Sequence, residues 1–239
     1  MSTTGPARAT PGDWFAQIVN EYDSLIRRAV PRYEKMTRQL TEYLPITANR
    51  VLELGSGTGN FSLALAHRYP TAELTAVDAA QEMIDVARDR IASVDPVFAA
   101  RTKFVTGRFE ELALDPGSFD VVASCISLHH VRDKTPLFRA IHSALAPGGR
   151  FCFADQMRAA PDAINQQNWE DWLSFCREPG NCTADEVHQL LEHAADYDHY
   201  ETVAQHLSML DDAGFAETDC LWRRGMWGIV TATRLTATS

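Results

Sequence analysis

The sequence predicts an α/β fold with a doubly wound, mostly parallel seven-stranded sheet. Three observations predict it. Short apolar strands alternate with amphipathic helices over residues 50–154, as in folds whose parallel strands are joined by crossover helices. A glycine-rich turn follows the first of these strands. The last two strand-like runs, 218–222 and 227–232, are joined by a short link, which predicts an antiparallel C-terminal pair.

Composition narrows the class of protein. The chain has 239 residues with 22 basic and 32 acidic side chains, so its net charge of −10 disfavours nucleic acid as a partner. There is no apolar run of about 18 residues, which predicts no membrane span. The first residues, MSTTGPARATPGD, lack the apolar core of a signal peptide and predict a cytoplasmic protein. The five cysteines include no Cys-x-x-Cys pair, so neither a disulfide framework nor a zinc ribbon is expected.

The N-terminal part precedes the alternating pattern. Residues 1–12 are rich in Thr, Pro, Gly and Ala and predict a disordered arm, with a single domain over 13–239. Two helical segments are expected in 13–45. In the first, apolar residues recur from Trp14 to Ile26, and Pro31 suits the first turn of the second.

In the alternating region, residues 50–154, each apolar segment predicts one strand or one helix. Strands are expected at 51–54, 74–77, 102–106, 119–124 and 150–154, and helices at 60–69, 80–94 and 135–145. A helical cap of two or three helices is expected over 157–200, where the alternation breaks. A helix over 201–213 then ends at Gly214, which suits a left-handed helix cap.

The strongest functional signal is the loop that follows the first strand. Gly55, Gly57 and Gly59 allow a sharp turn and a close backbone approach to a ligand, and Asp78 ends the next strand, where it can accept hydrogen bonds from ribose hydroxyls. The spacing is Gly-x-Gly-x-Gly, whereas the dinucleotide fingerprint is Gly-x-Gly-x-x-Gly. Glu53, two residues before the loop, would repel a pyrophosphate and suits a cationic ligand. The pattern therefore favours S-adenosylmethionine.

Four segments in order resemble the class I, Rossmann-like S-adenosylmethionine-dependent methyltransferases of the small-molecule type: VLELGSGTGNF (51–61), LTAVDAAQEMI (74–84), FDVVASCISLHHV (119–131) and LAPGGRFCFAD (145–155). The resemblance implies methyl transfer to a small-molecule acceptor, and a homodimer is compatible with it. It implies that these residues surround the cofactor: Glu53, Gly55, Ser56, Gly57, Gly59, Asp78, Ala79, Met83, Gly107, Arg108, Phe109, Ser124 and Cys125. Arg108 stands where many members carry an acidic residue, so a backbone carbonyl or Glu110 is expected to contact the adenine amino group instead.

A shorter segment, 21–36, is similar to a subset that includes carboxy-S-adenosylmethionine synthase. It implies that Tyr22 lies over the methionine end of the cofactor; the alternative is an ordinary core aromatic residue. Two other functions therefore stay open. One is an enzyme that modifies the cofactor itself or prepares a tRNA substrate, and the other is a non-catalytic S-adenosylmethionine-binding module.

His129 and His130 follow the fourth strand, at the edge where ligands of open α/β sheets bind. Either His129 accepts a proton from the acceptor, or both histidines pack the loop. Candidate substrate contacts are Tyr33, Trp169, Trp172 and His199, although the two tryptophans also suit a small core inside the cap. No metal is expected, because the histidines of the cap match no zinc or iron signature.

Overall fold

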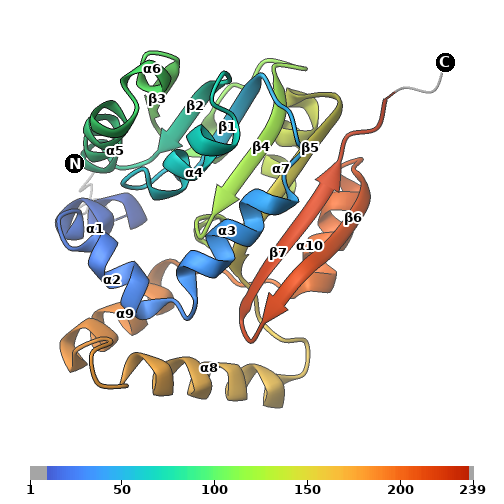
Figure 1. The fold of residues 1–239 in the computed structure, drawn as a ribbon. Coiled ribbons are helices and arrows are strands. Elements are labelled where there is room, and N and C mark those ends of the chain that lie inside the picture. The colour runs from blue at the N-terminus through green and yellow to red at the C-terminus, as the bar shows by residue number, and fades with distance from the viewer. Residues whose placement is uncertain (1–9, 237–239) are drawn as a thin grey trace, which may run out of the picture.

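Seven strands form one sheet in the order β3-β2-β1-β4-β5-β7-β6 (Figure 1). The structure is a computed structural model and describes residues 10–236. The strands are β1 (Arg50–Leu54), β2 (Glu73–Asp78), β3 (Thr102–Thr106), β4 (Phe119–Cys125), β5 (Leu145–Gln156), β6 (Ala216–Arg224) and β7 (Trp227–Thr233). Strands β1 to β5 pair in parallel, and β7 is antiparallel to both β5 and β6. The predicted fold class is confirmed.

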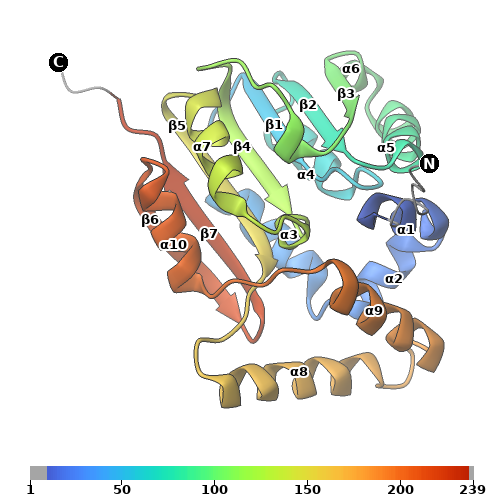
Figure 2. The ribbon, with the colours of Figure 1, turned by 180° about the vertical axis from the view of Figure 1, so that it is seen from behind.

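Helices cover both faces of the sheet (Figures 1 and 2). On one face lie α3 (Tyr33–Tyr43), α4 (Asn60–Arg68), α5 (Gln81–Val94) and the short α6 (Pro96–Ala99); on the other lie α7 (Lys134–Ala144) and α10 (Val203–Asp212). Each side has its own apolar core. Met36, Leu40 and Leu65 are buried in the first, and Phe138 and Leu210 in the second. The sheet is therefore buried on both faces, as its apolar strands predict.

The N-terminal prediction was wrong at one boundary. Helix α1 (Pro11–Ile18) begins inside the expected arm, because Thr10 and Asp13 form a reciprocal capping box and Pro11 suits the first turn. Residues 1–9 of that arm lie outside the described residues. The first expected helical segment is two helices, α1 and α2 (Tyr22–Ala29). The break between them turns α1 toward the carboxyl edge of the sheet, beside the glycine loop (Figure 1).

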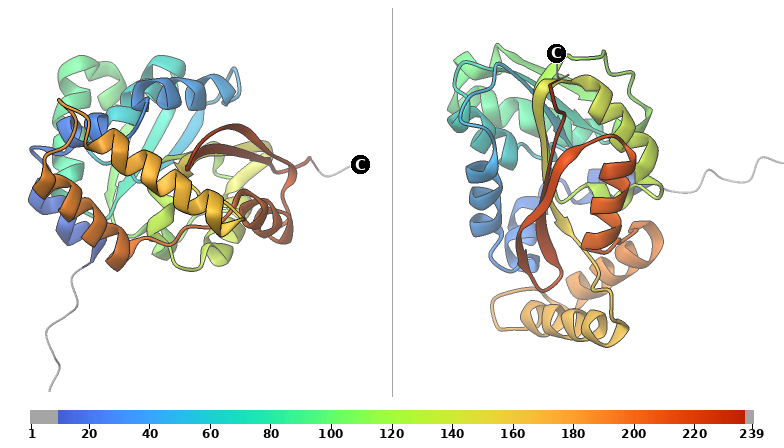
Figure 3. Two further views of the ribbon diagram at one scale, coloured as in Figure 1. Left: turned by 90° about the horizontal axis from the view of Figure 1, so that it is seen from below. Right: turned by 90° about the vertical axis from the view of Figure 1, so that its right-hand side faces the viewer.

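The cap consists of α8 (Asp162–Cys176) and α9 (Ala184–Tyr197), which lie across the carboxyl end of the sheet (Figure 3, left). It is joined to α2 by specific contacts. Arg28 donates to both carboxylate oxygens of Glu186, at 2.6 and 2.8 Å, and the Trp172 indole donates to the Ala29 carbonyl at 2.8 Å. Paired charges of this geometry fix orientation as well as adding stability. The cap and the N-terminal helices therefore form one roof over the sheet edge.

The composition predicted no membrane span and no disulfide framework. Within residues 10–236, no helix has the length and apolar character to cross a bilayer. All five cysteines lie in this range and are free thiols, of which Cys152 and Cys176 are buried. They pack as small apolar side chains.

Candidate active site

The three loop glycines serve different purposes. Gly55 and Gly57 have φ of 76° and 52°, in the left-handed region that favours glycine. A Cβ on Gly55 would also lie 1.9 Å from the Ser127 hydroxyl oxygen, so this position has no space for a side chain. Gly59, with φ of 84°, begins α4 and lies against Ala87 of α5, where a Cβ would come within 3.1 Å of the Ala87 Cα. It therefore lets two helices pack closely, while Gly55 and Gly57 border a cavity.

That cavity, here called the loop cavity, is an open cleft of about 820 Å³ at the carboxyl ends of β1 and β2. Asp78 is held at its edge, because its two carboxylate oxygens accept hydrogen bonds from the backbone N–H groups of Gly57 at 2.8 Å and Ala80 at 3.0 Å. Burial raises the pKa of this carboxyl. The residues that line the loop cavity are Thr10, Pro11, Gly12, Phe15, Tyr22, Gly55, Gly57, Asp78, Ala79, Met83, Arg108, Phe109, Glu110, Ile126, Ser127, His130 and Val131.

Of the expected cofactor contacts, eight line the loop cavity: Tyr22, Gly55, Gly57, Asp78, Ala79, Met83, Arg108 and Phe109. Six others do not appear in its wall: Glu53, Ser56, Gly59, Gly107, Ser124 and Cys125. Ser124 is fully buried and donates to the Leu54 carbonyl at 2.8 Å, which joins β4 to β1. Burial raises the pKa of Cys125 to about 12, so this thiol stays neutral. Ser124 and Cys125 therefore belong to the sheet beneath the loop and do not line the cavity.

Glu53 lies beneath the loop with one carboxylate oxygen unsatisfied. Ser62 donates to its Oε2 at 2.5 Å, whereas Oε1 has no hydrogen-bond partner among the described residues. Burial raises the pKa of Glu53 to about 8, and the nearby Asp78 carboxylate adds to this. Arg108, the cation in the cavity wall, is paired with Glu110 and Glu111. Buried acidic groups and a neutralised arginine suit a cationic nucleoside and disfavour a pyrophosphate.

The pKa of Glu53 gives a first testable prediction. This carboxyl has a pKa of 4.5 in the unfolded chain and of about 8 in the folded protein. Between these two pH values the folded state therefore holds one more proton than the unfolded state. Stability of the cofactor-free protein should therefore fall as pH rises from about 5 to 8. Glu53→Gln should flatten that decline in thermal unfolding measured at several pH values, while Glu73→Gln, an exposed control on β2, should leave it unchanged. An identical slope in Glu53→Gln and the wild type would contradict the prediction.

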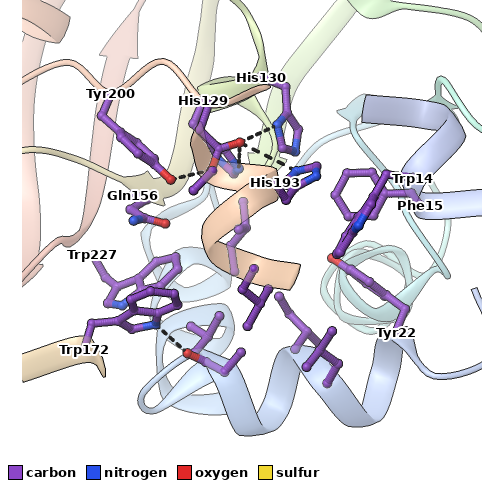
Figure 4. Close-up of a pocket in the computed structure, with 18 of the residues that line it drawn as sticks. Trp14, Phe15, Tyr22, His129, His130, Gln156, Trp172, His193, Tyr200 and Trp227 are labelled. Carbon is purple, nitrogen blue, oxygen red and sulfur yellow. Dashed lines mark hydrogen bonds and ion pairs between the residues drawn. The ribbon is translucent and has the colours of Figure 1, made fainter. Parts of the chain in front are cut away.

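A second cavity, here called the apolar pocket, lies between the roof and the sheet edge (Figure 4). It is partly open to solvent and has a volume of about 650 Å³. Its wall is mostly aromatic and aliphatic: Trp14, Phe15, Ile18, Tyr22, Leu25, Ile26, Ala29, Val30, Ile126, His129, His130, Gln156, Trp169, Trp172, Leu190, His193, Ala194, Asp198, Tyr200 and Trp227. Phe15, Tyr22, Ile126 and His130 line both cavities. These four side chains form the boundary shared by the two cavities, here called the neck.

His129 and Asp155 form a buried pair at the polar end of the apolar pocket. His129 follows β4 in the turn Leu128–His130, and Asp155 is in the neighbouring strand β5. The two side chains meet at 2.5 Å between Nδ1 and Oδ1, and the His129 backbone N–H donates to Oδ2 at 3.1 Å. Burial acts to lower the pKa of His129, but Asp155 and Asp198 outweigh it and raise that pKa. A carboxylate on Nδ1 fixes the ring and leaves Nε2 directed away from it.

Asp198 is brought to the histidines by the segment that follows α9. The His199 backbone N–H donates to the His129 carbonyl at 2.7 Å, and the buried Lys134 ammonium donates to the His199 carbonyl at 2.9 Å. Lys134 also pairs with Glu201. These contacts hold the segment against the turn after β4. Burial acts to raise the pKa of Asp198, but the field of His129 and His130 lowers it.

Two of the four expected substrate contacts line a cavity and two do not. Trp169 and Trp172 line the apolar pocket, while among the described residues around both cavities Tyr33 and His199 line neither. Tyr33 is buried in the core because the chain turns at Arg32, whose φ of 61° redirects α3. His199 contributes its backbone instead of its ring. Sequence reasoning missed Trp14, Phe15, Gln156 and Trp227 of the apolar pocket. It also missed Asp155, the partner of His129, which carried a signal because it lies near the end of its strand as Asp78 does.

Residues 51–149 match the family model described as a methyltransferase domain. This match, the strand order and the glycine loop make the chain similar to the class I, Rossmann-like S-adenosylmethionine-dependent methyltransferases. S-adenosylmethionine, the cofactor of these enzymes, carries no phosphate. It suits a loop cavity that contains Asp78 and whose arginine, Arg108, is paired with glutamates.

The particular relatives differ in what they act on. The chain is 29% identical to malonyl-[acyl-carrier protein] O-methyltransferase of Nitrosospira multiformis over 79% of its own length and 59% of the relative's. It is 23% identical to carboxy-S-adenosyl-L-methionine synthase of Trichodesmium erythraeum, over 86% of its own length and 82% of the relative's. It spans 44% to 59% of the length of three malonyl-[acyl-carrier protein] O-methyltransferases.

Among solved structures, a phosphoethanolamine N-methyltransferase of Haemonchus contortus, in complex with phosphomonomethylethanolamine and S-adenosylhomocysteine, has a TM-score of 0.68. The match covers 92% of this chain and 58% of the Haemonchus contortus chain. At 15% identity this likeness is one of fold.

Proposed function

We propose that the protein transfers the methyl group of S-adenosylmethionine to a small molecule bound in the apolar pocket. The observation that carries this proposal is the neck, where Phe15, Tyr22, Ile126 and His130 border both cavities. A cofactor in the loop cavity with its methionine end at the neck would direct its methyl group into the apolar pocket. Donor and acceptor would then meet within a space covered by the roof.

Bound S-adenosylmethionine would supply a methyl carbon already activated by the positive sulfur. The residues of this chain would hold and align it. Asp78 would accept hydrogen bonds from the ribose hydroxyls, and Ala79 and Met83 would border the adenine. Glu110 would accept from the adenine amino group, since Arg108 carries no acceptor. Tyr22 would lie over the methionine end. Alignment of this kind can supply about 7–11 kcal/mol in favourable cases.

The apolar pocket indicates the class of acceptor. Its walls are aromatic at Trp14, Trp169 and Trp172, while its polar groups gather at one end around His129 and Tyr200 (Figure 4). An apolar or aromatic molecule with one proton-bearing nucleophile at its end fits this distribution. Because Asp155 holds Nδ1 of His129, its Nε2 is the atom that would accept the proton. His130, at the neck, lies nearest the path of the methyl group.

Three alternatives are less well supported. A carboxylated cofactor would need a cation near the methionine end, but the described lining of the apolar pocket contains no lysine or arginine, and Arg108 of the loop cavity is ion-paired. A tRNA substrate is disfavoured by the net charge of −10. A non-catalytic binding module would have no use for a second pocket with a buried His–Asp pair.

Calorimetry tests the proposal directly. S-adenosylmethionine and S-adenosylhomocysteine should bind the purified protein, and NAD should not. Mass spectrometry of any ligand that copurifies distinguishes a carboxylated cofactor from the ordinary one. Aromatic phenols, thiols and amines should then be screened as acceptors by release of S-adenosylhomocysteine. Tight NAD binding without a response to S-adenosylhomocysteine would refute the proposal.

A further inference from the structure

Three histidines and one aspartate converge at the polar end of the apolar pocket. Nδ1 of His130 lies 3.1 Å from Oδ1 of Asp198, Nε2 of His193 lies 3.6 Å from the same oxygen, and Nε2 of His129 lies 3.8 Å from it. Figure 4 shows the three imidazole rings gathered together, His129 and His130 from the turn after β4 and His193 from α9. Ligand atoms of His129, His130 and Asp198 all lie within 4.8 Å of one another.

His130 and Asp198 form a direct ion pair, whereas the contacts of His129 and His193 with the same oxygen, at 3.8 and 3.6 Å, are longer than hydrogen bonds. Among the described residues, the two ring nitrogens of His193 have no hydrogen-bond partner. The Asp198 and His193 side chains are only 6% and 7% exposed but line the apolar pocket, so a ligand within that pocket would reach them. Unpaired buried polar atoms are costly, and those that face a pocket call for a ligand.

The spacing of these atoms suits a metal ion. With metal–ligand bonds of about 2.0–2.2 Å, two ligand atoms of a tetrahedral site lie about 3.3–3.6 Å apart. The separations of 3.1 to 3.8 Å from Asp198 Oδ1 bracket this value. Imidazole nitrogens with one carboxylate are the donor set of zinc and iron(II) sites.

The outer contacts of the ligands also match those of metal sites. A histidine that binds a metal usually donates its other ring N–H to a carboxylate, which fixes the ring. His129 meets Asp155 in this way, at 2.5 Å. The Tyr200 hydroxyl donates to Oδ2 of Asp198 and leaves Oδ1 directed at the histidines. Two of the ligands are therefore oriented by partners outside the cluster.

We propose that His129, His130 and Asp198 bind a divalent transition metal ion, zinc or iron(II), on the acceptor side of the neck, with His193 beside it. The proposal rests on the proposed methyl transfer and names how the acceptor is bound. All three ligands line the apolar pocket, so an open coordination position would be available to the acceptor's oxygen, nitrogen or sulfur. Coordination lowers the pKa of a proton-bearing nucleophile, and the proton that it releases would pass to His193, which lines the same pocket and is not a ligand, in place of a free His129.

Direct metal binding gives the test. The full chain is stripped with a chelator and dialysed, then titrated with Zn²⁺ in a competition assay and with Co²⁺ by visible absorption. Zn²⁺ should bind with one equivalent per chain, and Co²⁺ should give the intense bands of a four- or five-coordinate site. Asp198→Ala and His130→Ala should each weaken Zn²⁺ binding by about 100-fold or more, beyond the roughly 10–100-fold expected for an outer partner. His188→Ala, an exposed histidine of the same helix α9, is the matched control.

Circular dichroism and S-adenosylmethionine affinity show whether each variant is folded. Zn²⁺ affinity in folded Asp198→Ala equal to that of the wild type would overturn the proposal, as would featureless Co²⁺ spectra of the wild type. Undiminished turnover of the chelator-treated protein would overturn the acceptor-binding role. S-adenosylmethionine binding to the metal-free protein reports on the proposed function separately, because the loop cavity lies on the other side of the neck.

Discussion

Replacing His129 with alanine is expected to lower kcat by about 10²-fold or more, the range lost with a general base. The substitution removes the ring whose Nδ1 meets Asp155 and whose Nε2 lies among the polar groups of the apolar pocket. Loss of a free base and loss of a metal ligand both predict this fall in turnover. The dissociation constant of S-adenosylmethionine should change little, because His129 lines the acceptor side alone.

Two companion variants sharpen this measurement. Asp155→Asn keeps the shape of the pair but disturbs the orientation and tautomer of the imidazole, so it should also lower kcat. His142→Ala, on the outer helix α7 against Phe215, should leave kcat near the wild-type value. Turnover of His129→Ala within roughly threefold of wild type would indicate an enzyme that works by alignment alone. Tyr22 and Tyr200, which line the pocket, would then be the next positioning groups to replace.

The second large effect is expected at Asp78. Asp78→Ala should weaken S-adenosylmethionine binding by about 1–3 kcal/mol, the range for lost hydrogen bonds to a charged group. The variant also removes the acceptor for the Gly57 and Ala80 N–H groups, so part of the loss would come from a loosened loop. Isothermal calorimetry measures the affinity, and the kcat of the saturated enzyme should fall far less than in His129→Ala.

Asp120 provides a matched control for this variant. Its carboxylate also accepts from two backbone N–H groups, those of Asn49 and Arg50, but at the start of β1 and far along the sheet from the loop. Asp120→Ala should therefore lower thermal stability without changing S-adenosylmethionine affinity. Equal affinities for S-adenosylmethionine in Asp78→Ala and Asp120→Ala would show that Asp78 does not bind the ribose.

Local patterns allowed much of the fold to be predicted. The strands from β1 to β5 and the helices α4, α5 and α7 are each encoded by their own apolar period, whereas the short α6 was not predicted. Gly214, after α10, is one of the end signals that marked a helix boundary. The antiparallel pair β6 and β7 followed from its short link. The boundary at α1 was missed because the capping box of Thr10 and Asp13 lies within a segment whose composition is typical of disorder.

The part of the loop cavity formed by Gly55, Gly57, Asp78, Ala79 and Met83 was predictable, because these residues belong to consecutive segments of the chain from β1 to α5. Gly55, Gly57 and Asp78 meet wherever two neighbouring parallel strands end at the same edge. The exceptions are residues that approach from elsewhere. Phe15 comes from α1, and Ser127 comes from the turn after β4.

By itself the sequence determined the class of fold, the position of the glycine loop and the carboxylates around it. Those features depend on spacing within about 30 residues, the length of one strand–helix–strand unit. The tertiary structure decided the apolar pocket, the burial of Tyr33 and the meeting of Asp198 with His129 and His130. Asp198 is far from both histidines in the sequence, and it reaches them because Lys134 and the His129 carbonyl hold the His199 backbone. Contacts of this kind depend on how a cap packs onto a sheet edge, and no local period encodes that packing.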